Sequence, residues 1–422
     1  MIPCPPSRFV VFLKEPMIAG FLYDPRFSES FAVKRLTDSE DYAAGSKATA
    51  HILNNDNFRQ KENTMVSDKK TVFPPRLKKA LKITGIVIAC ILALVIGFFA
   101  YIIITEYKPA DVEEIEFTAS DRILDKDEIT ILSWNIGYCG LDKSMDFVMD
   151  GGTQVNPHSK QQVQDNLNAI AATIAEHPSD FYFLQEIDYK SHRSFRINEV
   201  ESLLPDIMTK VYARNFVCKC IPYPWPILGR MESGIAIMTD YKVDSAKRIK
   251  LPSPFTWPVS MFNLKRCLEV SYLPIAGSDK QLVLVNLHLE AYDDGEGKAA
   301  QREMLIKTIK EEYDKGNYVI AGGDFNHWFP GTDEIYGTAE GMWIPAYLDY
   351  SDIPEGWSYA YDSSVPSCRS IHAPYDGSSD WQFYLIDGFI LSPNVEAIDV
   401  RTFDYGFEHS DHNPVQMKVR LK

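Results

Sequence analysis

The sequence predicts an α/β fold in which two mixed sheets pack face to face with helices outside, and one transmembrane helix precedes this fold. Short apolar runs recur from about residue 128 onward, and about a dozen have the length and the β-branched and aromatic content of buried strands. Amphipathic stretches at 163–174 and 298–315 predict helices between them. A dozen strands are too many for one comfortable sheet, so two packed sheets are expected.

Several of the predicted strands end in a polar side chain. The four clearest examples are Asn135, Glu186, His288 and Asp324. In open α/β sheets, functional sites gather where strand ends meet. The cluster Ser410-Asp411-His412 precedes its strand instead of following one, so that strand must run antiparallel to the early strands to bring His412 to the same exposed rim.

Residues 83–105 contain no charged residue, and an apolar stretch of this length crosses a bilayer as a helix. Basic residues precede the stretch and acidic residues follow it, so the positive-inside rule places the N-terminus in the cytoplasm and the following domain outside the cell membrane. A cleaved signal peptide, a lipoprotein cleavage site ending at Cys90 and a buried core helix remain as alternatives. The length and uniform apolar character of the stretch disfavour all three.

The rest of the chain is assigned by composition. Residues 1–64 are expected to be a disordered N-terminal extension, or an untranslated stretch ahead of a natural start at Met65. Residues 65–82 form a basic juxtamembrane segment, 106–127 a linker and 128–422 the catalytic domain. The bilayer and a phosphoester substrate are the expected partners, and no pattern indicates a protein partner.

The balance of charge disfavours binding to long nucleic acids. Residues 106–422 hold 29 Lys and Arg against 49 Asp and Glu, whereas nucleic-acid-binding domains usually carry a basic footprint. A local basic groove stays compatible with this balance.

The seven cysteines lack zinc-site spacing and are expected to be small buried hydrophobic residues, with one disulfide as the alternative in an exported domain.

The polar residues near the strand ends are the side chains that a magnesium-dependent hydrolase needs. Oxygen ligands without a thiolate favour Mg²⁺ over zinc, with Mn²⁺ as the alternative ion. Mg²⁺ leaves coordination positions for water and phosphate oxygens. A histidine backed by a carboxylate can activate the attacking water, and His409 is the rival for that histidine. The set comprises Asn135, Glu186, His288, Asp324, Asn326, Asp387, Asp411 and His412.

Six short motifs occur in the order found in the endonuclease/exonuclease/phosphatase family, which the sequence resembles over residues 129–421. The resemblance implies a four-layer α/β sandwich with mainly antiparallel sheets and metal-dependent hydrolysis of phosphoric esters. The motifs are Trp134-Asn135, Leu184-Gln185-Glu186, Asn286-Leu287-His288, Gly323-Asp324-Phe325-Asn326, Ile386-Asp387 and Ser410-Asp411-His412-Asn413-Pro414.

The resemblance implies which residues hold the metal ion. Glu186 is similar to the direct magnesium ligand of the family, and Asn135 is similar to the amide that accompanies it. Asp411 resembles a further carboxylate on the metal side.

The resemblance also implies the catalytic roles. Asp324 and Asn326 are similar to the pair that positions the nucleophile and the scissile phosphate. His288 resembles the histidine that stabilises the phosphate or assists the leaving group. His412 and Asp387 resemble the imidazole–carboxylate dyad that activates water.

The function favoured by the sequence is hydrolysis of a lipid headgroup or another small phosphoester, as a phosphodiesterase or a phosphatase, by a membrane-anchored enzyme. A membrane-tethered nuclease is the first alternative, and a catalytically inactive binding module on the same fold is the second. Three segments rich in aromatic residues and proline, 221–228, 254–258 and 341–347, bear on the substrate. They either bury their rings in rigid loops or present them to a lipid interface.

Overall fold

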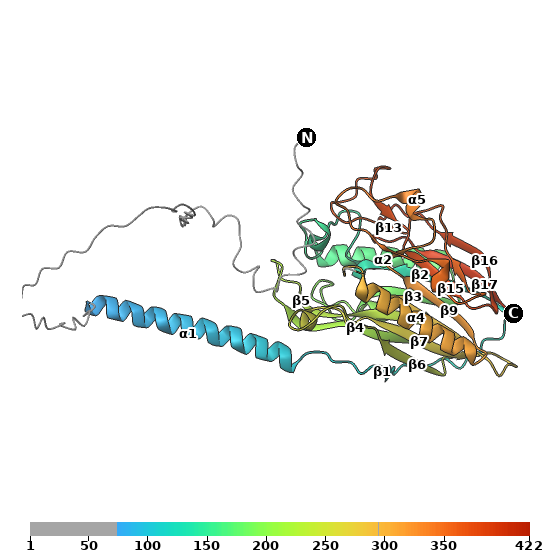
Figure 1. The fold of residues 1–422 in the computed structure, drawn as a ribbon, viewed down its shortest axis with the longest axis horizontal. Helices are drawn as coiled ribbons and strands as arrows, with labels where there is room; N and C mark the ends of the chain where they lie inside the picture. Colours follow the sequence, from blue (N-terminus) through green and yellow to red (C-terminus); the bar gives the residue numbers. More distant parts are fainter. Residues whose placement is uncertain (1–73, 294) are drawn as a thin grey trace, which may run out of the picture. The chain divides into compact units, whose positions relative to one another are not determined.

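The computed structural model describes residues 74–293 and 295–422 (Figure 1). The prediction of a disordered or untranslated segment at 1–64 lies outside the described residues, as do 65–73 of the basic segment. The chain divides into two compact units, and the boundary between them falls at Phe99 and Ala100. The first of these units along the described chain holds most of one helix, and the second holds all of the sheets.

Helix α1 (Pro75–Ile104) covers nearly all of the predicted transmembrane stretch. It begins before that stretch, because the basic residues Lys78, Lys79 and Lys82 continue the helix without a breaking residue. In the described part of the chain it is the one helix long and apolar enough to cross a membrane.

Two sheets form the second unit. The seven-stranded sheet has the order β1 (Val112–Glu114), β6 (Ser245–Lys250), β7 (Cys267–Pro274), β8 (Gln281–His288), β9 (Tyr318–Asp324), β15 (Asp387–Leu391) and β12 (Ser358–Ala360). The six-stranded sheet has the order β16 (Val395–Thr402), β17 (Val415–Leu421), β2 (Glu128–Asn135), β3 (Phe181–Asp188), β5 (Gly229–Thr239) and β4 (Thr209–Ile221). Within these two sheets only the pairs β2–β3 and β8–β9 are parallel. The predicted mixed, mainly antiparallel sheets are confirmed.

The sheets and helices stack in four layers. Apolar side chains from both sheets, among them Ile131, Phe183, Leu284 and Phe389, form one buried cluster between them. Helix α2 (Lys160–Glu176) packs its predicted apolar face on the outer side of the six-stranded sheet. Helix α4 (Glu296–Asp314) packs on the outer side of the seven-stranded sheet. The four-layer sandwich is therefore confirmed.

The strand register brings the predicted site residues to one rim. In the seven-stranded sheet His288 and Asp324 end the parallel strands β8 and β9, and Asp387 begins the antiparallel β15 directly opposite Asp324. In the other sheet β17 runs antiparallel to β2, as predicted, and its first residue Val415 lies opposite Ser133. The chain just before β17 therefore reaches the end of β2.

The apolar pattern of residues 383–391 predicts one continuous strand, but the structure divides this stretch in two. The first part is β14 (Phe383–Tyr384), which pairs with β13 (Cys368–Arg369) in a separate ribbon, and the second part is β15. The division has a local cause, because the backbone amides of Ile386 and Asp387 both donate to Ser367 Oγ instead of joining a ladder. Asp387 is consequently the first residue of its strand.

The segment 106–127, predicted as a linker, also contributes to the sandwich. Its strand β1 pairs with β6 at the sheet edge, and Leu124 is fully buried between the sheets.

The six cysteines of the described residues are free, and Cys139, Cys218, Cys267 and Cys368 are buried. The remaining short elements are α3 (Glu199–Ser202), α5 (Asp333–Tyr336), β10 (His327–Trp328), β11 (Ala346–Tyr347) and four 3-10 turns at 137–139, 148–150, 259–262 and 350–352.

Candidate active site

Asn135, the last residue of β2, joins the two sheets at the rim. Its side-chain amide donates to Asp324 Oδ2 at 3.0 Å and lies 3.4 Å from Glu186 Oε1. Its side-chain oxygen accepts from the amide of Gly137 at 3.1 Å. The amide therefore holds the carboxylates from β3 and β9 at one point.

Two of the predicted residues adopt a left-handed backbone. Glu186 has φ 50° and Asn326 has φ 52°, a region that residues with a side chain rarely occupy. Glu186 lies at a bulge in the pairing of β3 with β5, between Leu184 and Ile187. Such backbone strain persists where the surrounding structure imposes it, and it often marks functional sites.

A steric restriction explains why a glycine precedes Asp324 at position 323. Its φ is 140°, and a Cβ built there would lie 2.1 Å from the backbone oxygen of Leu287. Only glycine fits this position, where β8 and β9 approach closely just before Asp324.

His412 and Asp387 form a hydrogen-bonded dyad. His412 Nδ1 lies 2.8 Å from Asp387 Oδ2, which also accepts from Ser367 Oγ at 2.7 Å. Trp134 Nε1 donates to the backbone oxygen of His412 at 2.8 Å and so fixes the main chain beneath the ring. The imidazole was expected at an exposed rim, but it is 6 % exposed, because Trp134 and the 367–369 segment pack around it.

The dyad raises the basicity of His412. Burial alone would lower its pKa, yet Cys368 and Asp387 raise the pKa well above the usual value. The Cys368 thiol is itself neutral, because burial raises its pKa to about 12. Asp387, which bonds to Nδ1 of the ring, is therefore the partner that stabilises the protonated imidazole.

Asp324 lies between the two histidines. Its Oδ2 is 3.4 Å from His288 Nε2 and 3.8 Å from His412 Nε2. Burial and the nearby Asp387 raise the pKa of Asp324 to about 7. Burial, with Arg266 and His412 adding to the effect, lowers the pKa of His288 well below its usual range, so His288 is neutral.

The donor set fits a divalent cation. Burial, with a contribution from Glu186, raises the pKa of Asp411 to about 6, so these carboxylates crowd one another in a poorly solvated place. In the described part of the chain, Asp387 Oδ1 is buried without a hydrogen-bond partner. A cation of the hard, oxygen-preferring kind beside Glu186 and Asp411 would relieve the crowding of these carboxylates.

Two groups of residues can supply ligands. Asp324, Asp387 and His412 offer ligand atoms within 4.8 Å of one another. However, His412 Nδ1 and Asp387 Oδ2 already bond to each other, which occupies two of those donors. The second group comprises Glu186, whose side chain is 25 % exposed, and the buried Asn135 on the neighbouring strand, whose amide lies 3.4 Å from it.

Two supporting residues of the site, Arg193 and Ser367, lie outside any recognisable sequence motif. Arg193 binds Asp188 through two bonds of 3.1 Å, and its Nη1 lies 3.8 Å from Glu186 Oε2. Its guanidinium stacks on Tyr138, with its central carbon 3.6 Å from the ring centre. Ser367 orients Asp387. Arg193 could have been suspected only because it lies close after the Glu186 motif.

His409, the alternative to His412 as the base, does not join the dyad. His409 Nδ1 is 3.2 Å from Asn166 Oδ1, a residue of helix α2.

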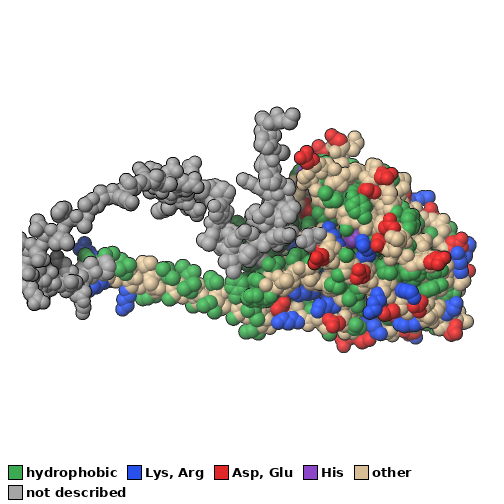
Figure 2. Space-filling model, in the orientation of Figure 1, with side chains coloured by type: hydrophobic (Ala, Val, Ile, Leu, Met, Phe, Trp, Pro, Cys, Tyr) green, Lys and Arg blue, Asp and Glu red, His purple; other side chains and the backbone are tan. Residues whose placement is uncertain are grey.

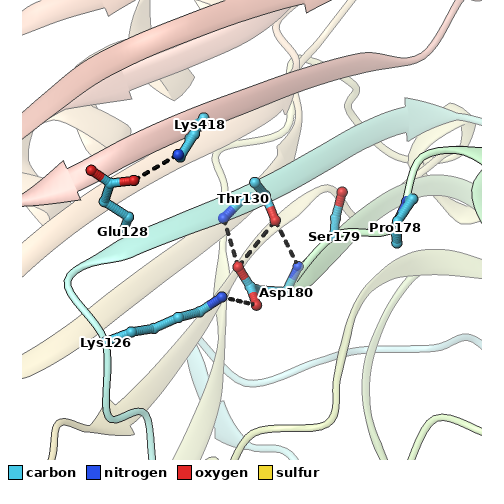
Figure 3. A pocket seen from close by; sticks show the side chains of 7 residues that line it. All are labelled: Lys126, Glu128, Thr130, Pro178, Ser179, Asp180 and Lys418. Atoms are coloured by element: carbon cyan, nitrogen blue, oxygen red, sulfur yellow. Dashed lines mark hydrogen bonds and ion pairs between the residues drawn. The ribbon is translucent and has the colours of Figure 1, made fainter.

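A hollow lined by Lys126, Glu128 and Asp180 lies at the other end of β2 and β3, away from the rim (Figure 3). Its charges pair within it, as in the 2.7 Å contact between Lys126 and Asp180, so it offers no free binding group of the catalytic kind.

The chain is similar to a known protein family over most of its folded domain. The model of the endonuclease/exonuclease/phosphatase family matches residues 132–412, which include all eight predicted site residues. No curated protein matches the chain. A solved endonuclease/exonuclease/phosphatase from Beutenbergia cavernae shares 17% identity and a TM-score of 0.51, over 70% of this chain and 72% of that one.

More distant structures also match. TDP2 of D. rerio complexed with a single-strand DNA product shares 15% identity and a TM-score of 0.45, over 70% of this chain and 99% of that one. The human Nocturnin catalytic domain with bound sulfate shares 14% identity and a TM-score of 0.44, over 73% of this chain and 97% of that one. On the strength of the matched family model, the chain belongs to the endonuclease/exonuclease/phosphatase family and is a metal-dependent phosphoric ester hydrolase.

Proposed function

We propose that the chain is a membrane-anchored, Mg²⁺-dependent hydrolase in which His412 and Asp387 activate water to cleave a lipid headgroup or another small phosphoester. The observation that carries this proposal is the 2.8 Å bond from His412 Nδ1 to Asp387, with Nε2 of the same ring turned toward Asp324. The ring therefore has one nitrogen fixed by a carboxylate and the other directed to the carboxylate cluster.

In this mechanism His412 Nε2 takes the proton of the attacking water. The Asp387 carboxylate fixes the tautomer and stabilises the imidazolium that forms. A raised pKa makes the neutral His412 ring a stronger proton acceptor, but the ring must first lose its own proton, so the form that acts as base is populated as the pH rises toward that pKa.

The neighbouring residues position the reactants. Asp324 lies 3.8 Å from His412 Nε2, so its carboxylate can accept the other hydrogen of the water. The amide of Asn326 is oriented by donating to Leu289 O at 2.9 Å, and it faces the same rim. Neutral His288 can donate a hydrogen bond to a phosphate oxygen without adding a charge.

Glu186, Asn135 and Asp411 are the residues that would hold Mg²⁺. A magnesium ion held by these residues would supply a positive charge against the phosphoryl oxygens and help to orient them for in-line attack. Arg193 keeps Glu186 in place at 3.8 Å while its own charge is largely committed to Asp188.

Charge distribution favours a small substrate over a long nucleic acid. Residues 106–422 are strongly acidic in sum, and on the face drawn in Figure 2 the acidic and basic side chains are interspersed. Nuclease affinity ordinarily rests on many Lys and Arg contacts to phosphates.

A substrate screen tests the proposed activity. The full chain, purified in lipid nanodiscs with Mg²⁺, should hydrolyse a phospholipid, sphingomyelin or a soluble chromogenic phosphodiester in preference to plasmid DNA or RNA. Salt-sensitive cleavage of plasmid DNA, with no hydrolysis of any lipid or small phosphoester, would establish the nuclease instead.

The proposed anchor is α1, with the N-terminus in the cytoplasm. Its N-terminal flank is basic and the segment after it is acidic, and basic flanks stay on the cytoplasmic side. Protease added to intact cells should therefore remove residues 106–422, as followed by antibodies to a C-terminal tag. Protection of the tag until the membrane is permeabilised would reverse the orientation, and release of the tag by salt washing would exclude a spanning anchor.

A further inference from the structure

Two loops at the active-site end of the sandwich expose large aromatic rings. Tyr223 and Trp225, in the hairpin between β4 and β5, are 51% and 84% exposed, and Trp257 in the loop after β6 is 67% exposed. By contrast, Trp343 of the third aromatic segment packs against the buried cluster beneath α4. We call 222–228 and 251–266 the aromatic loops.

The register places both loops at the same end as the catalytic rim. Asp188, which ends β3, lies opposite Ser233, so residues 229–232 of β5 and the hairpin tip extend past the rim. In the other sheet Leu268 near the start of β7 lies opposite Leu287, next to His288. The loop that precedes β7 therefore begins and ends beside the rim.

The chain also enters the domain at this end. Val112, the first residue of β1, lies opposite Ile249 near the end of β6. Glu106 Oε1 lies 3.5 Å from Lys265 Nζ, in the second aromatic loop. Seven residues connect the last residue of α1 to β1, and such a connection spans at most roughly 28 Å. The chain that follows the proposed anchor therefore enters the domain beside the second aromatic loop.

The chain in and around the aromatic loops lacks acidic residues. Residues 216–231 and 251–266 contain no Asp or Glu, although the domain around them is strongly acidic in sum. Lys219 is exposed beside the first loop, whereas Arg230 pairs with Glu232. The basic residues of the second loop are already committed, because Lys265 pairs with Glu106 and Arg266 is buried against Glu290. Exposed Trp and Tyr in loops free of acidic residues suit the headgroup layer of a bilayer.

We infer that the rim end of the domain docks on the bilayer through the two aromatic loops, and that the substrate is a phosphoester in the headgroup layer of that bilayer. The naming of the substrate rests on the proposed hydrolase function, whereas the docking rests on the aromatic loops and on the proposed anchor. Docking in this way turns the catalytic rim, where the Glu186 side chain is 25 % exposed, toward the lipid headgroups, so a headgroup reaches the site without leaving the membrane.

Tryptophan fluorescence tests the docking directly. All seven tryptophans lie between Trp134 and Trp381, and α1 contains none, so the signal reports on the domain and not on the anchor. In phosphatidylcholine vesicles with a minor share of phosphatidylserine, phosphatidylcholine brominated near the headgroup should quench the full chain. Combining Trp225→Ala with Trp257→Ala should abolish most of this quenching. Quenching that persists unchanged in the double variant would overturn the docking surface.

Activity of the same variants tests the substrate. The double variant should lose about tenfold in hydrolysis of vesicle lipid and keep its rate on a soluble chromogenic phosphodiester. The control is Met208→Ala, which removes an exposed side chain just before β4 at the opposite end and should change neither rate.

The outcomes separate the two proposals. An equal loss on both substrates, or a wild-type protein that cleaves only soluble phosphoesters, would overturn the membrane substrate and leave the hydrolase standing. A wild-type protein that is quenched yet hydrolyses no phosphoester would overturn the proposed function and support the docking surface.

Discussion

Replacing His412 by alanine should lower the rate of phosphoester hydrolysis by about 10²–10⁴, because this removes the group that takes the proton from water. The loss should appear in kcat at saturating Mg²⁺, with KM little changed, since the imidazole is proposed to act on the attacking water and not to bind the substrate. The measurement is steady-state hydrolysis of the soluble phosphodiester by the full chain.

Three comparisons make this expectation specific. Asp387→Asn should cost less than His412→Ala, because the ring remains while its orienting charge is lost. His409→Ala is the matched control, since His409 contacts Asn166 and not the dyad, and it should keep near-normal activity. Turnover close to normal in His412→Ala would show that another group is the base.

Because His412 is buried, His412→Ala can also lower the stability of the fold. Its removal leaves the Asp387 carboxylate with Ser367 as its side-chain partner in the described structure, and an underpaired buried carboxylate costs roughly 1–3 kcal/mol of stability. His412→Asn, which keeps a polar group in the cavity, should unfold at nearly the wild-type temperature and still be inactive. Circular dichroism melting of both variants separates loss of chemistry from loss of fold.

The rim can be predicted from the sequence because an apolar run that ends in a polar residue indicates where a buried strand ends. Apolar runs ending in Asn135, Glu186, His288 and Asp324 predict both the strands and their meeting point, since parallel neighbours end at the same edge. The antiparallel course of β17 follows from the position of Asp411 and His412 before their strand. These features are local in sequence, and so they can be recognised without the fold.

Features that depend on distant contacts could not be predicted. The start of β15 at Asp387 depends on Ser367 Oγ, which lies twenty residues earlier and binds two backbone amides. The position of Arg193 beside Glu186 depends on a bulge and on Tyr138 from another loop. Likewise, β1 joins the sheet through β6, more than a hundred residues away, and a short charged strand carries little periodic signal.

Glu186→Gln should raise the Mg²⁺ concentration required for half-maximal activity by about 100-fold, with most of the maximal rate recovered at saturation. Glutamine keeps the size of the side chain and its contact with Asn135 Nδ2, now through an amide oxygen, but lacks the charge that attracts a divalent cation. Loss of a group that only supports a metal ligand already costs 10–100-fold, so loss of a direct carboxylate ligand should lie at or above this range. The measurement is the rate as a function of free Mg²⁺, with the metal first removed by EDTA.

Wild-type activity should disappear in EDTA and return with Mg²⁺ or Mn²⁺, and greater recovery with zinc would contradict a site of oxygen ligands. Glu408→Gln is the control for the change in net charge, because Glu408 is an exposed residue that pairs with Lys143 outside the carboxylate cluster. It should leave the Mg²⁺ requirement unchanged. An unchanged requirement in Glu186→Gln, together with a raised one in Asp324→Asn, would move the ion to the group of Asp324, Asp387 and His412. The dyad bond at 2.8 Å would then have to open for the ion to bind, and His412 could no longer serve as the base.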